Sequence, residues 1–161
     1  MRDADFERLY AEHAQPLLAF LVYRTGDRPA SEDLLADTFE RALKAKRGFD
    51  RRKASEKTWL YSIALNLIRD RARRADAGRR AMDKVYAGGI GRDHDPFDSL
   101  DDRYALQDAL QTLSPEERDT VSLRYGADLS VPEIAKLTRE KLTTVEGRLY
   151  RALRKLKREL E

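Results

Sequence analysis

Apolar residues recur every three or four positions along most of this chain, which is the spacing of one face of an α-helix. No stretch shows the alternation of apolar and polar residues between turn residues that is typical of a β-strand. Three stretches rich in Gly, Pro, Ser and charged residues interrupt the helical pattern, and we predict that they are connections. These stretches are residues 25–31, 46–55 and 87–99.

The third connection is the longest and is predicted to separate two domains. We therefore expect an all-α protein with a larger helical domain over residues 1–78, a flexible acidic linker over 79–102, and a smaller helix-turn-helix domain over 103–161. Gly and Pro together occupy only 13 positions and charged residues make up 38% of the chain. This composition favours a well-solvated helical protein over a sheet-rich or disordered one.

Two helix starts in the C-terminal domain carry strong sequence signals. Ser114 precedes Pro115 and stands three residues before Glu117, and Ser130 stands three residues before Glu133. A serine whose side chain caps the helix, with a glutamate three residues later, forms the capping box that marks a helix start. Helices are therefore predicted to begin directly after Ser114 and Ser130.

The segment TWLYSIALNLIRDRARR, residues 58–74, is predicted to be a helix with two different faces. Its broad apolar face belongs in a bundle core. That face contains Leu60, Tyr61, Ile63, Ala64, Leu65, Leu67 and Ile68. The remaining narrow stripe carries an aromatic residue, an amide and arginines: Trp59, Ser62, Asn66, Arg69, Asp70 and Arg73.

The residue types of this stripe are those that bind unpaired nucleic acid. An aromatic ring stacks on bases, arginines follow phosphates, and an amide can contact a base edge. The loop before the helix adds Arg51, Arg52 and Lys53, with Lys57 beside Ser55, in a position where a flipped base could be held. The alternative is that Trp59 packs under the preceding loop, while the arginines and the basic loop are merely solvated.

The C-terminal segment from Leu129 is predicted to form a helix, a short turn and a second helix that starts near Thr143. Ile134 and Ala135 of the first helix face inward. The second helix has an apolar stripe of Val145, Leu149, Ala152, Leu153 and Leu156. Its opposite face carries Thr143, Thr144, Gly147, Arg148, Arg151, Arg154, Lys155 and Arg158. This division is expected of a recognition helix in the major groove, although an ordinary amphipathic surface helix has the same pattern.

Composition excludes several other functions. The chain has no cysteine, so thiolate chemistry and disulfides are excluded. Its longest apolar run, residues 16–23, is far shorter than the roughly 20 residues of a membrane span, and its start lacks the order of a secretory signal. His13 and His94 have no companion ligands at metal spacing. We therefore expect a cytoplasmic protein that is not an enzyme and needs neither cofactor nor metal.

Taken in order, several segments resemble the extracytoplasmic-function sigma factors, which direct bacterial RNA polymerase to promoters. The match covers nearly the whole chain. It runs through FERLYAEHAQPLLAFLVYRTGD, ASEDLLADTFERAL, TWLYSIALNLIRDRARR, ALQTLSPEERDTVSLRYGADLSVPEIAKL and TVEGRLYRAL. The order and spacing of these segments carry the resemblance, since none of them is decisive alone.

The resemblance implies roles for particular residues. The helix over 58–74 and the loop before it would recognise and open the minus-ten element, through Ser55, Lys57, Trp59, Ser62, Asn66, Arg69 and Arg73. The helix-turn-helix would read the minus-thirty-five element, through Arg139, Lys141, Thr143, Thr144, Arg148, Arg151, Arg154 and Lys155. The linker acids would thread through a basic channel of the polymerase, or form an ordinary connector: Asp93, Asp95, Asp98, Asp101 and Asp102.

The segment SEDLLADTFERAL is similar to the one that grips the polymerase clamp. Its helical period places Asp33, Asp37 and Glu40 on one acidic face, and assigns Leu35, Phe39, Ala42 and Leu43 to the core. An acidic face suits a basic partner helix. The same acids could instead pair within the helix, Asp37 with Arg41 and Glu40 with Lys44.

The sequence departs from the family pattern at the turn of the helix-turn-helix. Arg139 stands where the family usually has glycine, so the backbone there is expected to be strained or the turn to differ. Thr143 stands where a small residue or glycine is common, and Glu146 where a basic one is frequent. Glu146 would repel nearby phosphate, so the promoter sequence cannot be transferred from relatives.

The expected function is that of a sigma factor that binds core RNA polymerase and both duplex and single-stranded promoter DNA, without inserting into a membrane. The expected location is the cytoplasm, at the nucleoid when active or at the membrane through an anti-sigma factor, the further partner that the family implies. One alternative is a decoy that binds an anti-sigma factor or polymerase without reading DNA. A conventional helix-turn-helix repressor is another, but it leaves the N-terminal half unexplained.

Overall fold

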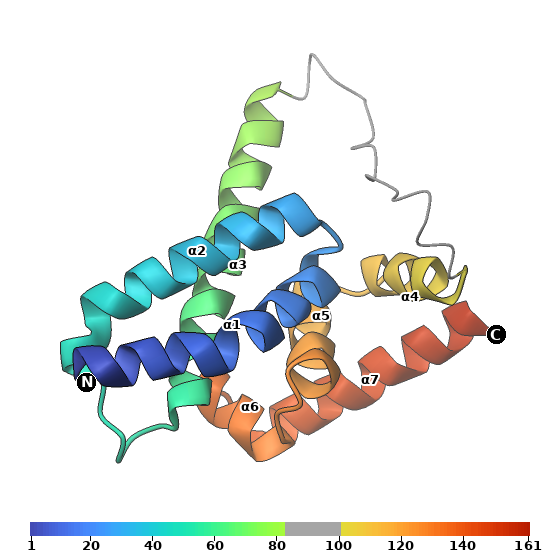
Figure 1. The fold of residues 1–161 in the computed structure, drawn as a ribbon. Helices are drawn as coiled ribbons and strands as arrows, with labels where there is room; N and C mark the ends of the chain where they lie inside the picture. Colours follow the sequence, from blue (N-terminus) through green and yellow to red (C-terminus); the bar gives the residue numbers. More distant parts are fainter. Residues whose placement is uncertain (83–100) are drawn as a thin grey trace.

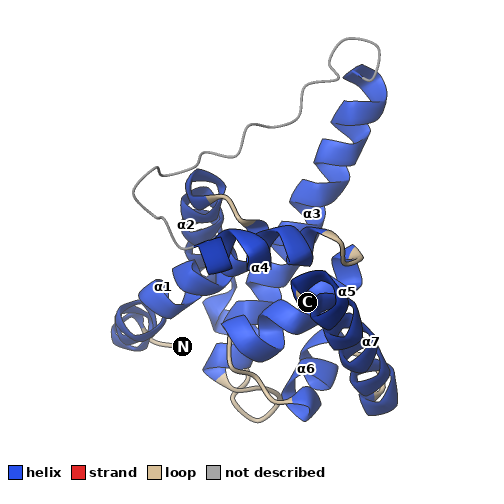
Figure 2. Ribbon diagram, turned by 90° about the vertical axis from the view of Figure 1, so that its right-hand side faces the viewer, coloured by secondary structure: helices blue, strands red, loops and turns tan. Residues whose placement is uncertain are grey.

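The computed structural model describes residues 1–82 and 101–161, and it confirms the all-α prediction within these ranges (Figure 1). The N-terminal domain consists of α1 (Asp3–Thr25), α2 (Arg28–Ala45), the short 3₁₀ turn η1 (Lys46–Gly48) and α3 (Glu56–Met82). Helices α1 and α2 pack side by side, and α3 crosses them (Figure 1). The C-terminal half of α3 projects beyond the other helices (Figure 2).

The connection between α1 and α2 is shorter than predicted because a tight turn and a helix cap share it. Gly26 adopts a left-handed conformation with φ of 69°, and its N–H donates to the carbonyl of Val22 at 2.8 Å, which ends α1. The carboxylate of Asp27 then accepts from the N–H of Ala30 and caps α2. Pro29 lies in the first turn of α2, where proline is tolerated. The predicted connection over 25–31 is therefore wrong in length.

The C-terminal domain consists of α4 (Asp101–Gln111), α5 (Pro115–Val121), the π-helical turn η2 (Ser122–Gly126), α6 (Val131–Thr138) and α7 (Leu142–Leu160). Both predicted helix starts are confirmed. The Ser114 hydroxyl accepts from the N–H of Glu117, and the Ser130 hydroxyl accepts from the N–H of Glu133. Each glutamate side chain in turn accepts from the N–H of its serine, which completes both capping boxes.

The two domains share one hydrophobic core. The predicted core face of α3 is buried, except that Leu67 is only partly so. It joins residues of α1 and α2 in one cluster, and residues of the C-terminal domain complete that cluster: Leu123, Ala127, Leu129, Ile134, Ala135 and Val145. Helix α1 packs on η2, and α3 packs on α6. The domains are therefore docked against each other.

Two residues predicted to lie in the core are exposed instead. Leu43 of α2 is 46% exposed and Leu153 of α7 is 38% exposed. Both lie at the edge of an apolar stripe whose central residues, such as Phe39 and Ala152, fill the available interior. An edge position on an amphipathic helix is the place where helical periodicity least distinguishes core from surface.

Much of the predicted linker lies outside the described residues, including Asp93, Asp95 and Asp98 and also His94. Helix α3 continues to Met82, and α4 begins at Asp101. Among the described helices, none has the length and apolar character needed to cross a membrane.

Candidate nucleic-acid interface

Helix α3 gathers the predicted minus-ten residues along one side of a cleft. Trp59 is partly buried and its ring packs on Phe49, with ring centroids 4.7 Å apart and an interplanar angle of 41°. Trp59 thus does contact the preceding loop, as the structural alternative required. The Ser62 hydroxyl donates to the carbonyl of Trp59 at 2.6 Å, and Asn66 is exposed. An open amide next to a half-open aromatic ring leaves this side of α3 able to contact a base.

The other predicted minus-ten residues lie around the two ends of this surface. Ser55 caps α3, since its hydroxyl accepts from the N–H of Thr58 at 3.0 Å. Lys57 stands over the ring of Tyr61, with its Nζ 5.8 Å from the ring centroid. Arg73, farther along α3, forms an ion pair with Asp70. Ser55 and Lys57 therefore have structural contacts of their own at the start of the helix.

The cleft has a volume of about 570 Å³ and lies between α3 and α6. Trp59, Ser62, Asn66 and Arg69 form the α3 side. The opposite side comes from the end of α6: Lys136, Leu137, Thr138 and Arg139. Lys53 of the preceding loop adds a further cation, and none of the residues that line the cleft is acidic. The cleft therefore attracts anions.

A second cleft, of about 490 Å³, lies on the other side of Arg69 and contains a buried ion-pair cluster. Arg24 Nε donates to Asp119 Oδ1 at 2.7 Å, and Arg69 Nε donates to Asp119 Oδ2 at 3.3 Å. The side chains of Arg24 and Asp119 are only 8% and 5% exposed, whereas Arg69 is 41% exposed. One acid of the C-terminal domain thus holds two arginines of the N-terminal domain.

Helix α7 exposes most of its predicted groove-reading residues. Thr143, Thr144, Arg151 and Arg154 are exposed. The Arg148 guanidinium instead binds both carboxylate oxygens of Glu140, with Nη1 2.8 Å from Oε1, and is only 16% exposed. This hydrogen bond, opposed by partial burial, holds the pKa of Glu140 below its usual range.

Lys155, also predicted to contact DNA, is tied to helix α5. Its Nζ donates to Glu117 Oε1 at 2.7 Å. Burial alone would raise the pKa of Glu117, but the hydrogen bonds from Lys155 and Ser114 outweigh that effect and lower it. Lys155 thus links the recognition helix to the first helix of the helix-turn-helix unit.

The turn between α6 and α7 has the backbone strain that its sequence predicts. Arg139 ends α6 in the left-handed conformation, with φ of 59° and ψ of 39°. A residue with a Cβ pays a steric cost there that glycine avoids. Arg139 is exposed and lines the first cleft, and Lys141 is exposed at the start of α7.

The predicted acidic face of α2 is exposed. Asp33, Asp37 and Glu40 are all open to solvent. Glu40 pairs with Lys44 at 3.0 Å within the helix, as the structural alternative proposed, and Asp33 lies 3.8 Å from Arg71 of α3. Pairs this exposed contribute little to stability, so these acids stay available to a basic partner.

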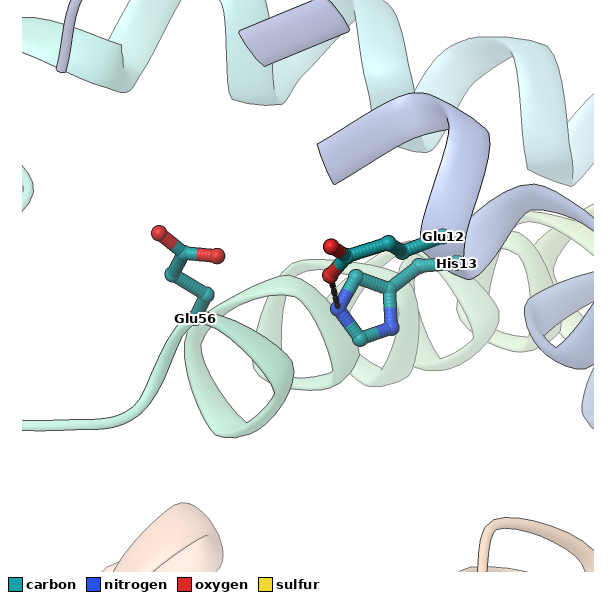
Figure 3. A group of neighbouring side chains, drawn as sticks. All are labelled: Glu12, His13 and Glu56. Carbon is teal, nitrogen blue, oxygen red and sulfur yellow. Dashed lines mark ion pairs between the residues drawn. The ribbon is translucent and has the colours of Figure 1, made fainter. Parts of the chain in front are cut away.

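One carboxylate and imidazole group resembles a metal site, which the sequence did not predict. Glu12, His13 and Glu56 offer ligand atoms within 4.8 Å of one another (Figure 3). However, Glu56 Oε1 lies 3.3 Å from the guanidinium groups of both Arg8 and Arg51. Two cations already neutralise this acid, so the group is explained as a surface ion-pair cluster.

The sequence did not reveal Arg24, Asp119 and Lys136 as parts of the interface. Each stands in an amphipathic helix where a charge reads as ordinary solvation, and only the docking of the domains brings them together. Arg24 follows the apolar run of α1, so a basic residue in the last turn read as a favourable helix end.

Comparisons with known proteins agree with the two-domain arrangement of residues. Residues 9–78 match the model for sigma-70 region 2, and residues 103–156 match the model for sigma-70 region 4. The chain is 30% identical to the sigma factor SigX of Bacillus subtilis, over 97% of this chain and 84% of that protein. It is also 30% identical to SigL of Mycobacterium tuberculosis, over 95% of this chain and 87% of that protein.

A third relative is longer. The sigma factor BldN of Streptomyces coelicolor is 30% identical over 95% of this chain, but the chain spans 59% of its length. Among solved structures, the sigma factor RpoE of Bartonella quintana, in complex with the anti-sigma factor NepR, has the same fold with a TM-score of 0.80 and 23% identity. That match covers 97% of this chain and 96% of RpoE.

A second solved structure, CnrH in complex with the cytosolic domain of CnrY, matches with a TM-score of 0.71 and 25% identity over 99% of this chain and 89% of CnrH. Together with the sequence matches, this places the chain plainly: it belongs to the ECF RNA polymerase sigma factors.

Proposed function

We propose that this sigma factor binds core RNA polymerase, reads duplex minus-thirty-five DNA with α7, and opens the minus-ten region with the stripe on α3. The observation that carries the proposal is the α3 side of the first cleft, where Trp59, Asn66 and Arg69 lie in line on one helix. A stacking ring, a base-edge amide and a phosphate-binding cation are together what an unpaired strand needs.

Strand opening in this proposal requires no chemical step. Each base taken out of the duplex costs a few kcal/mol of lost stacking and pairing. Stacking on an aromatic side chain returns about 1–3 kcal/mol per base, and the cations Lys53 and Arg69 stabilise the strand's phosphates. The protein therefore favours the open state by binding it.

Duplex reading is assigned to the exposed face of α7. Arg151 and Arg154 can contact guanine or phosphate, and Thr143 and Thr144 lie at the N-terminal end of the helix, where a recognition helix usually meets base edges. Arg148 and Lys155 would reach DNA only by leaving Glu140 and Glu117. We therefore assign sequence reading mainly to the first four residues.

The remaining assignments concern partners and location. Residues 1–78 would carry the polymerase and minus-ten contacts, residues 103–161 the minus-thirty-five contacts, and 79–102 would join them. The exposed acids Asp33, Asp37 and Glu40 would meet a basic helix of the polymerase. An anti-sigma factor is a further proposed partner, since both solved relatives were captured with one. These activities belong in the cytoplasm, at the nucleoid or beneath the membrane.

The test is to reconstitute the chain with core polymerase, transcribe a fragmented genome and sequence the transcript starts. The proposal predicts a small set of start sites that share two sequence elements. Stable binding to the core without any specific start would instead favour the decoy. The stripe of Trp59, Asn66 and Arg69 argues against a decoy, because a decoy has no use for it.

A further inference from the structure

The predicted minus-ten surface and the predicted minus-thirty-five surface are unequally available when the two domains are docked. On α3, Arg69 is bound to Asp119 and Trp59 is stacked on Phe49. Helix α6 faces both across the first cleft. On α7, Thr143, Thr144, Arg151 and Arg154 point to solvent. The docked form therefore leaves one surface free while it engages the other.

The contacts of Arg69 are the more informative half of this difference. A carboxylate that accepts from a guanidinium resembles a phosphate oxygen in both charge and geometry. Arg69 cannot give the same Nε–H to Asp119 and to a phosphate. A DNA strand that uses Arg69 must therefore displace Asp119, and with it the docked C-terminal domain.

The charge of the cleft acts in the same direction. Lys53 and Arg69 stand on one side and Lys136 and Arg139 on the other, with no acid in the lining. Four cations brought together repel one another, so docking has an electrostatic cost here. The buried cluster of Asp119 with Arg24, and the shared apolar core, offset that cost. A polyanion that enters the cleft relieves the repulsion.

We propose that the docked arrangement is a state that binds minus-thirty-five duplex but excludes the minus-ten strand, with Asp119 standing in for the strand's phosphate on Arg69. The inference rests on the proposed function of the two surfaces. Docking and strand binding then oppose each other reciprocally, because whatever favours one disfavours the other by the same free energy. Duplex binding is not coupled to docking in this way.

The docked state can be trapped with a disulfide across the domain boundary. A Cβ built on Gly126 would lie 3.5 Å from the Cβ of Tyr23, within the range that disulfides span. The chain has no cysteine of its own, so Tyr23→Cys with Gly126→Cys introduces the only two. Formation of this disulfide in the full-length protein is expected, and its failure to form would show that the domains do not dock in solution.

The measurement is DNA binding of the full-length double variant, oxidised and reduced, followed by fluorescence anisotropy. The two probes are a short labelled oligothymidine strand and a short labelled duplex that carries the mapped minus-thirty-five element. Oxidation is expected to weaken strand binding at least about tenfold, the worth of one stacked base, and to leave duplex binding unchanged. Reduction should restore strand binding.

The opposite perturbation is Asp119→Asn, which removes the acid that holds Arg69. It should strengthen strand binding, whereas Asp128→Asn, at an exposed acid whose ion pair is with Arg124 of its own domain, should not. Equal strand binding by the oxidised and reduced forms would overturn the inference, as would parallel loss of strand and duplex binding. If the reduced protein binds neither probe, the proposed function itself fails and the inference fails with it.

Discussion

The buried pair of Arg24 and Asp119 gives the most quantitative prediction. The two side chains are 8% and 5% exposed, and 2.7 Å separates Arg24 Nε from Asp119 Oδ1. Asp119→Asn keeps the shape of the side chain but leaves the Arg24 charge buried without a counter-charge. Breaking one partner of a buried pair costs about 3–5 kcal/mol. We expect the free energy of unfolding of the docked protein to fall by about that amount.

A double-mutant cycle separates this charge effect from packing. Arg24→Met alone should cost less than Asp119→Asn, because Asp119 retains Arg69 at 3.3 Å. The double variant leaves only Arg69 without its partner, and Arg69 is 41% exposed and can be solvated. Its destabilisation should therefore be smaller than the sum of the two single effects.

The assay is unfolding in urea, which does not screen the ion pair as a salt denaturant would. Trp59 is the only tryptophan, so its fluorescence reports the N-terminal domain, while circular dichroism reports all helices. Asp128→Asn is the control, since its pair with Arg124 spans 3.8 Å and Asp128 is 94% exposed. A loss below about 1 kcal/mol for Asp119→Asn, the size expected of a surface pair, would refute the reasoning.

Three further predictions concern the helix-turn-helix. Arg139→Gly should raise the free energy of unfolding by about 1 kcal/mol, because glycine removes the cost of a left-handed backbone; Arg139→Ala keeps the Cβ, and an equal gain from it would contradict this. Gly147→Ala should stabilise α7 by about 0.5–1 kcal/mol in the same urea assay, since its Cβ would meet only the flexible end of Arg151, and a loss would contradict this. The pKa of Glu140 is lowered by Arg148, so its contribution is present at neutral pH and is lost as the pH falls through that lowered value, below about pH 4. Glu140→Gln should therefore flatten the acid side of a stability–pH curve, and an unchanged slope would show that the pair does not stabilise the fold.

The helices could be predicted from the sequence because their signals are local. Capping boxes at Ser114 and Ser130 depend on four consecutive residues, and the apolar face of α3 depends on helical spacing alone. The errors occurred where neighbours decide. Leu43 and Leu153 lie at stripe edges, and their exposure depends on what packs beside them. The early start of α2 depends on one cap, Asp27, inside a stretch that reads as a turn.

The candidate site was predictable by face but not by contact. The order of Trp59, Asn66 and Arg69 along one stripe follows from helical geometry. Their surroundings do not, because Asp119 reaches Arg69 across 50 residues of sequence. Both the buried acid and the first cleft arise from docking of two domains, and docking has no signature in the period of either domain alone.

The central claim is that the stripe on α3 opens the minus-ten region. Trp59→Ala with Asn66→Ala, assembled with core polymerase on a mapped promoter, should abolish permanganate reactivity of minus-ten thymines while core affinity stays unchanged. Arg74→Ala, at an exposed residue beyond the cleft on the same helix, is the matched control and should open the promoter normally. Loss of core affinity in parallel with loss of opening, or normal opening by the double variant, would contradict the account.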